Sequence, residues 1–390
     1  MSSPLSGLTT RGRCLVAAGV ACMVCALVLD ERDLLRAGVL LLVLPVLTAL
    51  LHTLLPLRLE VSRSVGPEPA SVGQPCPVTT EVRAVARQPA GGLLVLDPVP
   101  AELGRDAVLA LPRLRARESA VLQHALLPTR RGEHRVGPLR VSLTDALGLV
   151  QVQRPVGAAT PVLVRPRVEP LRPVVLGGAA GAETAARASS GHAVRDTQLR
   201  GYVPGDEIRS IHWRSSARRD ELMVRTAEQG QRARVTVLLD NRDSAFGGPA
   251  GEPAFERAVS LAASLAEHLR RTSTPVRVVT ADAAVLAPGG SGLDQLAVLG
   301  LSATTELGPA LAVAGSDELV AVLGEPGAAD ATVLLEHRAR VGAAGTVAHL
   351  LPGDGVPLLT GAGWLVTAVG GSTPLADLLP AFSAAGSVGR

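Results

Sequence analysis

Two uncharged apolar runs near the N-terminus constrain the fold of this chain more than any other feature. Residues 14–29 (CLVAAGVACMVCALVL) carry no charge, and residues 37–57 (AGVLLLVLPVLTALLHTLLPL) carry none apart from the titratable His52. A membrane-spanning helix needs about 20 apolar residues, with a lower limit of roughly 17. The second run meets this length, and uncharged flanking residues extend the first. We therefore expect a transmembrane helical hairpin over residues 1–58, turned by DERDLLR.

Charges beside the two runs predict an orientation. Arg11 and Arg13 precede the first run, Arg58 and Arg63 follow the second, and the turn has two Arg against three acidic residues. Because basic residues are retained on the cytoplasmic side, we expect both ends and the soluble domains to be cytoplasmic. The alternative is a cleaved signal peptide followed by one span, but no clear small-residue cleavage site precedes Asp30.

Composition limits the chemistry available to the remaining residues. The chain has 390 residues, of which 47% are hydrophobic and 2% aromatic, so we expect globular domains with Val, Leu and Ala cores. It has no lysine, which excludes a Walker A lysine and a Schiff-base lysine. The formal charge of +3 is too small to indicate a nucleic-acid partner. Four cysteines, three of them in the first apolar run, indicate no disulfide framework.

Residues 59–170 predict a β-sandwich-like domain. Short runs of alternating polarity, such as RLEVSRSV, VTTEVRAVA and ESAVLQHALLP, are separated by Pro and Gly. RRGEHRVGPLRV predicts a hairpin or corner, with Gly132 and Gly137 available for positive φ. His124 and His134 have no metal-ligand partners at a useful spacing, so we expect solvated or hydrogen-bonded strand residues.

The last part of the chain predicts an α/β domain. Residues 171–196 are rich in Ala and Gly and predict a flexible linker or loop. In residues 197–390, apolar runs alternate with helical patterns, which predicts a mainly parallel sheet. We expect strands at 234–240, 275–282, 331–336 and 363–370, and helices at 253–271, 293–300, 306–313, 316–323 and in the closing PLADLLPAF.

The stretch YVPGDEIRSIHWRSSARRDELMVR (202–225) gathers rare residue types. Its five Arg are nearly balanced by four acidic residues, whereas a phosphate-binding stripe should be net basic, so we expect no nucleic acid. Gly205 allows a tight turn, Asp206 can cap a helix, and Arg209 and Trp213 are an i, i+4 pair on that helix. The pattern favours a docking helix, either at an internal seam or at a partner interface.

This stretch carries a family resemblance. The order of segments resembles that of the bacterial domain-of-unknown-function 58 family. It consists of two spans, a β region with RRGEHRVGP and DALGL, then LVRPRV, then the stretch above, and finally VTVLLD. Gly205-Asp206, Arg209, Ile211, Trp213 and Ala217-Arg218 fall at the family's spacing; with Tyr202 these are the predicted interaction or structural residues. The resemblance implies a von Willebrand factor A-like C-terminal part and a MoxR-type AAA+ ATPase, often encoded beside such proteins; it implies no established activity.

A von Willebrand factor A-like domain raises the question of a metal site. Such a site uses Asp-x-Ser-x-Ser after the first strand, because a hard divalent cation prefers oxygen ligands. Here Asp240 and Ser244 match the pattern, but Arg242 replaces the middle hydroxyl, and its guanidinium has no lone pair to offer. We expect a degenerate site in which Arg242 pairs with Asp240 or Asp243. Asp282 and Glu336 follow later predicted strands but cannot be placed in a coordination shell.

These observations predict a membrane-anchored, non-catalytic scaffold or adaptor that needs no cofactor and acts with a MoxR-type ATPase in assembly or envelope-related processes. It would contact membrane lipid through residues 14–29 and 37–57. One alternative is a divalent-metal-dependent binding module that uses Asp240, Ser244 and Asp243. Another is a hydrolase built on His212 and a nearby serine, Ser215 or Ser216, although no G-x-S-x-G motif is present.

Overall fold

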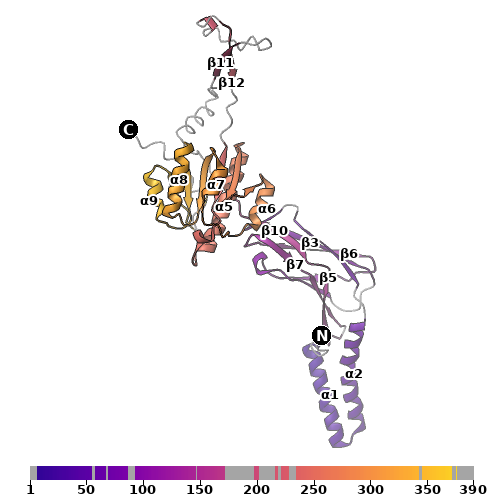
Figure 1. Cartoon of the computed structure of the whole chain (residues 1–390). Helices are drawn as coiled ribbons and strands as arrows, with labels where there is room; N and C mark the ends of the chain where they lie inside the picture. The colour runs from indigo at the N-terminus through magenta and orange to yellow at the C-terminus, as the bar shows by residue number, and fades with distance from the viewer. Residues whose placement is uncertain are drawn as a thin grey trace. The chain divides into compact units, whose positions relative to one another are not determined.

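The computed structural model of the chain divides into two compact units, Met1–Arg165 and Pro166–Arg390, and each is described by itself (Figure 1). The structure describes residues 7–54, 58–66, 69–86, 93–145, 147–171, 197–201, 216–217, 221–227, 234–341, 345–370 and 375. The predicted linker at 171–196 lies outside these ranges, apart from Leu171.

The first unit begins with two long apolar helices, α1 (Thr10–Leu29) and α2 (Arg32–Leu54). Both are long and apolar enough to cross a membrane, as the sequence predicts. They pack against each other at two glycines: a Cβ on Gly38 would lie 2.8 Å from Met23 Cγ, and one on Gly19 would lie 2.9 Å from Leu42 Cγ. Small residues of this kind allow the backbones of two helices to approach closely.

The start of α1 is fastened to the β-rich part of the same unit. Thr9 donates its backbone N–H to the Leu149 carbonyl at 2.9 Å and its hydroxyl to the Gly148 carbonyl at 2.6 Å. A Cβ on Gly12 would lie 2.3 Å from the Leu149 oxygen, so the helix approaches this turn as closely as a glycine allows. Asp145 shapes the turn by accepting the Val150 N–H at 2.7 Å, which gives the DALGL motif a structural role.

The described residues of the rest of this unit form ten strands in three sheets. One sheet has the order β1-β3-β6, the second β2-β10-β7 and the third β5-β4-β8-β9. Buried side chains of the first sheet pack against the third in one apolar cluster and against the second in another, which gives a sandwich-like arrangement. The strands are β1 (Leu59–Val65), β2 (Ala70–Ser71), β3 (Cys76–Ala84), β4 (Leu93–Asp97), β5 (Ala107–Leu111), β6 (Ser119–Leu126), β7 (Gly132–Val136), β8 (Leu139–Thr144), β9 (Gln151–Val156) and β10 (Thr160–Arg165).

The predicted hairpin or corner at RRGEHRVGPLRV is a corner. β7 pairs with β10, whereas the next strand, β8, pairs with β4 and β9 in another sheet. Gly132 and Gly137 have φ of 127° and 87°, the left-handed region that favours glycine. The chain therefore changes sheets at Gly137.

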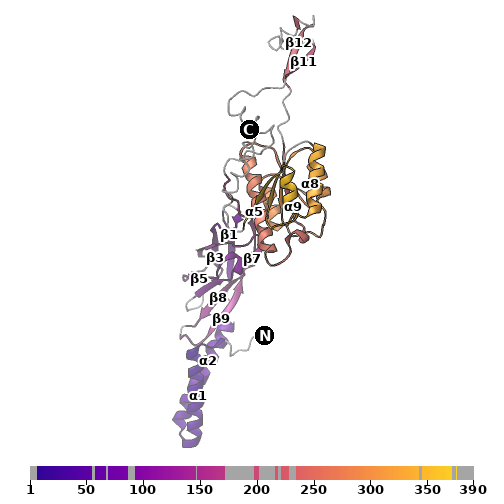
Figure 2. The ribbon, with the colours of Figure 1, turned by 90° about the vertical axis from the view of Figure 1, so that its left-hand side faces the viewer.

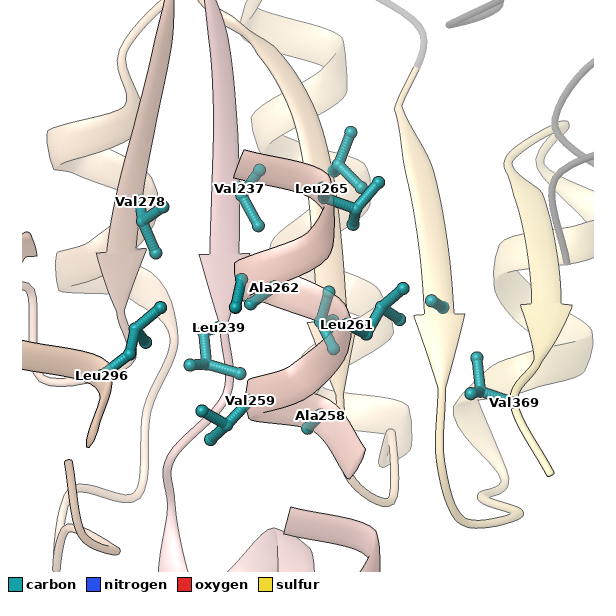
Figure 3. Close-up of a cluster of buried hydrophobic side chains, with 14 of the residues drawn as sticks. Val237, Leu239, Ala258, Val259, Leu261, Ala262, Leu265, Val278, Leu296 and Val369 are labelled. Atoms are coloured by element: carbon teal, nitrogen blue, oxygen red, sulfur yellow. The ribbon is translucent and has the colours of Figure 1, made fainter. Parts of the chain in front are cut away.

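The second unit contains a six-stranded sheet with the order β15-β14-β13-β16-β17-β18, in which β15 alone is antiparallel to its neighbour. α5 (Gly251–Arg271) packs on one face together with α6 (Gly290–Val298), and α7, α8 and α9 pack on the other. Figure 2 shows α5 on one side of the sheet and α8 and α9 on the other. In Figure 3, Val259, Ala262 and Leu265 of α5 point toward the central strands. The remaining elements are β13 (Val235–Leu239), β14 (Val276–Thr280), β15 (Val285–Leu286), α7 (Gly308–Ala314), β16 (Glu318–Leu323), α8 (Ala328–Val341), β17 (Thr346–His349), α9 (Gly355–Gly361) and β18 (Leu365–Ala368).

Two predicted elements of this sheet are wrong. Residues 316–323 were expected to be helical but form β16, and residues 331–336 were expected to be a strand but lie inside α8. The run LVAVL of β16 is buried on both faces, and a short apolar run of this kind has no periodicity that separates helix from strand. β17 and α9 were not predicted, and the predicted closing helix lies outside the described residues except for Leu375.

Residues 166–171 pack on α5. Glu169 accepts from Arg257 Nη1 at 3.1 Å and from the Leu375 backbone N–H at 3.0 Å, and its own N–H donates to Ser264 Oγ at 2.9 Å. Farther along, β11 (Thr197–Gly201) and β12 (Met223–Ala227) pair as an antiparallel ribbon. The ribbon joins the two ends of the sequence stretch predicted to be a docking helix.

Candidate functional site

The candidate site lies at the carboxyl end of β13, where the order in which strands are added to the sheet reverses. β14 follows β13 on one side and β16 lies on the other, so the connections leave toward opposite faces. In doubly wound α/β sheets, ligands bind outside the carboxyl ends of the strands at this switch point. Asp240 directly follows β13, and Asp330 lies in the first turn of α8, which follows β16.

Arg242 occupies the space between these two carboxylates. Its Nε and Nη2 atoms donate to the two oxygens of Asp240, both at 2.9 Å, in a bidentate fork. Its Nη1 and Nη2 atoms donate to the two oxygens of Asp330, at 2.6 and 3.0 Å. Nη1 also donates to the Thr305 carbonyl at 3.1 Å. All five guanidinium hydrogens thus have an acceptor.

Backbone groups hold the carboxylates in place. Asp240 also accepts from the Arg242 and Gly324 N–H groups, at 3.1 and 3.4 Å, and Asp330 accepts from the Gly327 N–H at 3.0 Å. The side chains of Asp240 and Arg242 are 0% and 4% exposed, and that of Asp330 is 14% exposed. Water therefore screens these charges little, and each charged group depends on its oppositely charged partners to offset the cost of burial.

The electrostatics of the cluster favour a permanently charged Arg242. Burial by itself lowers the pKa of its guanidinium, but the hydrogen bonds and negative charges of Asp240 and Asp330 outweigh burial and raise that pKa. A divalent cation does not fit this arrangement, because the carboxylate oxygens that would bind it already accept from Arg242. Among the described residues, no group of three or more His, Cys, Asp or Glu side chains is arranged so that it could hold a metal ion.

The predicted site residues have different places in this geometry. Arg242 was expected to pair with Asp240 or Asp243, and it pairs with Asp240. Asp243 and Ser244 are exposed. Asp282 is exposed and accepts from the Thr280 hydroxyl, and Glu336 lies within α8 rather than after a strand. Asp330 was missed, because residues 318–323 were not recognised as the strand that leads to it.

Most of the predicted docking residues lie outside the described part of the chain. These are Tyr202, Gly205, Asp206, Arg209, Ile211, Trp213 and Arg218, together with His212 and Ser215 of the hydrolase alternative. Ala217 is described and exposed. Its neighbour Ser216 is buried, and its hydroxyl accepts from the Met223 N–H at 2.9 Å, so this hydroxyl has a structural partner at the end of the ribbon where Gly201 and Met223 pair.

A second buried polar cluster divides the core of the β-rich unit. Arg63, Thr80 and His124 each lie between two inward apolar positions, on β1, β3 and β6, and Asp97 is the buried last residue of β4, two positions after Val95. One side of this polar layer is the cluster with Val82, Val95 and Leu122; the other is the cluster with Val78 and Leu126. Alternation along each strand places Arg63, Thr80 and His124 on one face of the first sheet, and Asp97 comes from β4 of the third sheet, against which this face packs.

Arg63 is the best-bonded member of the polar layer. It donates to Asp97 Oδ1 at 2.6 Å and to the Val136 carbonyl at 2.5 Å, and a Cβ on Gly137 would lie 2.6 Å from its Nη1 atom. His124 Nε2 lies 3.5 Å from Asp97 Oδ2, and neither atom has a hydrogen-bond partner. Burial raises the pKa of Asp97 and lowers that of His124, and the Arg63 charge also lowers the histidine's pKa. His124 therefore differs from its prediction as a solvated or hydrogen-bonded residue; His134 contacts the Arg130 carbonyl at 3.2 Å.

Solved structures resemble the chain weakly. A CARDB domain from Pyrococcus furiosus, solved in complex with di-metal ions, covers 28% of this chain and 93% of its own length at 16% identity, with a TM-score of 0.21. The putative ApaA protein of Bordetella pertussis covers 28% and 94% at 17% identity, with a TM-score of 0.20. Likenesses at this level carry no argument about function.

Sequence comparison is more informative. The uncharacterized protein YeaD of Bacillus subtilis is 27% identical over 230 residues, which are 56% of this chain and 55% of that protein. The chain therefore spans about half the length of this curated relative. The model of the family described as "Protein of unknown function DUF58" matches residues 198–312, which include the stretch 202–225, β13 and Arg242. The resemblance to the DUF58 family is thus confirmed over residues 198–312.

Proposed function

We propose that this protein is a membrane-anchored, non-catalytic scaffold or adaptor whose soluble units are cytoplasmic. Its α/β unit acts as a von Willebrand factor A-like domain that has replaced a metal ion with an arginine. The proposal is supported by two apolar helices suited to anchoring, by the strand order of the sheet and by the match to a family without an established activity.

One observation carries the proposal: Arg242 fills the switch point with all five of its donors satisfied. At this position a doubly wound domain would otherwise bind its ligand or ion. A guanidinium between two carboxylates supplies positive charge without an exchangeable ligand, and it cannot act as a Lewis acid. The edge of the sheet is therefore suited to a fixed recognition surface and not to a reaction.

An energy-consuming partner is needed if the scaffold does mechanical work. The chain has no lysine and hence no Walker A site, so ATP hydrolysis would come from another protein. We propose a MoxR-type AAA+ ATPase as this partner, with the docking stretch around Trp213 and Arg209 as a contact. Trp and Arg are the residue types that most often anchor protein interfaces.

Co-purification tests this proposal. The full chain is extracted in mild detergent with a MoxR-type ATPase encoded beside it, and the amount of ATPase retained is measured. We expect retention by the wild-type protein, at least a tenfold loss with Trp213→Ala or Arg209→Ala, and no change with the surface variant Arg271→Ala. Absence of the ATPase from the wild-type preparation, in every nucleotide state, would remove the partner from the proposal.

The two alternatives have less support. Metal binding through Asp240 would require Arg242 to leave a buried pair of carboxylates. A hydrolase built on Ser216 would require a hydroxyl that is buried and engaged with Met223. A His212→Ala protein with unchanged function in cells would count against any hydrolase built on that histidine.

A further inference from the structure

Several loops of the β-rich unit meet at the end where the apolar hairpin joins it. β1 is the element that follows α2 in the chain, and the Val85 N–H donates to the Arg58 carbonyl at 3.0 Å. The Arg117 N–H donates to the Ala84 carbonyl at 2.6 Å, and the Ala84 N–H donates to the Glu118 carbonyl at 2.9 Å. The loop between β5 and β6, residues 112–118, therefore lies beside the first residue of β1.

The turn between β8 and β9 lies at the same end. Leu93 of β4 is registered against both Leu111, which precedes the 112–118 loop, and Leu143, which precedes the turn at 145–150. That turn binds Thr9 and contacts Gly12 in the first turn of α1. One end of the unit is thus surrounded by the start of α1, the end of β3 and two inter-strand loops, with the chain arriving there from α2.

This end is strongly basic. Exposed arginines from four separate places gather on it, and we call them the arginine collar: Arg11, Arg13, Arg58, Arg83, Arg113, Arg115 and Arg117. The described acidic side chains exposed there are Glu60 and Glu118, and Glu118 already accepts from the Arg115 backbone N–H at 2.7 Å. Among the described residues, no collar guanidinium forms an ion pair.

Apolar side chains are exposed within the same rim. Leu147, at the tip of the 145–150 turn, is 53% exposed, and Val85, beside Arg58, is 44% exposed. A rim of arginines with isolated exposed aliphatic side chains, placed where two apolar helices begin and end, has the composition of a surface that meets the headgroup region of a bilayer.

We propose that the arginine collar binds the anionic headgroups of the membrane leaflet from which the hairpin enters. This inference rests on the proposed membrane anchoring. Guanidinium groups form bidentate hydrogen bonds with phosphate oxygens, and a basic residue near an anionic leaflet strengthens membrane association by about 1 kcal/mol, or about fivefold. The contact would hold the β-rich unit against the membrane at a fixed orientation, since Thr9 and Gly12 already attach it to α1.

Retained lipid tests the collar in the full chain. The protein is reconstituted in liposomes of equimolar phosphatidylcholine and phosphatidylglycerol and extracted in mild detergent, and the bound phospholipids are quantified. We expect enrichment of phosphatidylglycerol in the wild-type protein. The triple variant R113Q/R115Q/R117Q should lower that enrichment at least fivefold, whereas R113K/R115K/R117K, which keeps the charge, should restore most of it.

A matched control removes the same charge from the opposite end of the unit. The variant R105Q/R130Q/R135Q should retain the wild-type enrichment. Raising the salt concentration should weaken the enrichment in the wild-type protein and in this control variant alike. Wild-type protein that resists alkaline carbonate extraction but binds the two lipids in their bulk ratio would overturn the collar alone. Release of the wild-type protein by carbonate would overturn both the collar and the anchoring, and an equal loss in the control variant would overturn the assignment to the collar.

Discussion

Removal of the Arg242 charge is the most informative perturbation of the α/β unit. Arg242→Met keeps an apolar stem of similar length but leaves Asp240, which is 0% exposed, and Asp330, which is 14% exposed, without their cation. Breaking a buried ion pair by removing one partner costs about 3–5 kcal/mol. For a unit of this size, about 2–4 °C of melting temperature is lost per kcal/mol, so we expect a decrease of roughly 6–20 °C.

Trp364 reports this change in the intact protein. Its side chain is buried in the helix-covered core of the α/β unit, and Trp213 is the only other tryptophan in the chain. In a Trp213→Phe background, tryptophan fluorescence therefore follows unfolding of the α/β unit separately from the rest of the chain. The exposed arginine Arg271 provides a control, because Arg271→Met removes a surface ion pair that contributes little.

A double-mutant cycle separates the ion pair from general loss of packing. Asp330→Asn combined with Arg242→Met should cost less than the sum of the single variants, with a coupling of at least about 1 kcal/mol, because the second change relieves an unpaired carboxylate. The reasoning is refuted if Arg242→Met melts with the Arg271→Met control, or if the two single effects add without coupling.

Three further predictions concern the first unit. His124 has a pKa below its ordinary value of about 6.5, so the folded unit takes up its proton less readily than the unfolded chain; stability should fall as pH drops below about 6.5, by at most about 1.4 kcal/mol per pH unit. The raised pKa of Asp97 has the opposite effect, because it makes the folded unit more stable as the pH falls further. Chemical denaturation of the wild-type protein and of His124→Gln from pH 7 to 5 isolates the contribution of the histidine. An equal dependence of the unfolding free energy on pH in both proteins would contradict this account. Gly38→Leu should separate α1 from α2 and lower the thermal midpoint in detergent, whereas Ala37→Leu, one position away and exposed, should not; similar midpoints would show that the glycine contact is dispensable. Gly12→Val should release the turn at 145–150 from α1 and speed amide exchange of the Thr9 and Val150 regions at least tenfold, with Ala17→Val on the exposed face of α1 as the control; unchanged exchange would mean that Thr9 alone holds the joint.

The sequence predicted the elements whose pattern is local. Residues 14–29 and 37–57 have the length and polarity of spanning helices, and RVTVLLD followed by an amphipathic helix gave β13 and α5 correctly. The errors at 316–323 and 331–336 came from short apolar runs, whose state depends on which neighbours bury them. β16 is a strand because β13 and β17 flank it, and no residue within 318–323 encodes that contact.

The polar clusters depend on contacts between distant residues and were harder to predict. The replacement of a hydroxyl by Arg242 was visible in the sequence, and Asp240 was one of the two partners that the sequence left open for it. Asp330 lies 88 positions after Arg242 in the sequence. Its role can be predicted only if β16 and α8 are assigned correctly. The polar layer is a comparable case, because Arg63, Asp97 and His124 come from three strands, β1, β4 and β6, whose inward positions become neighbours only in the folded sandwich.

Titration of the full-length protein with Mn²⁺ by calorimetry tests the central claim, that Arg242 has taken the place of an exchangeable cation. The wild-type protein should give no saturable heat and no change in thermal midpoint. Arg242→Ser removes the guanidinium and places a hydroxyl between Asp240 and Ser244, so this variant should gain one saturable site that Asp240→Asn abolishes. Saturable Mn²⁺ binding by the wild-type protein, lost on Asp240→Asn, would contradict the account and restore a metal-dependent function.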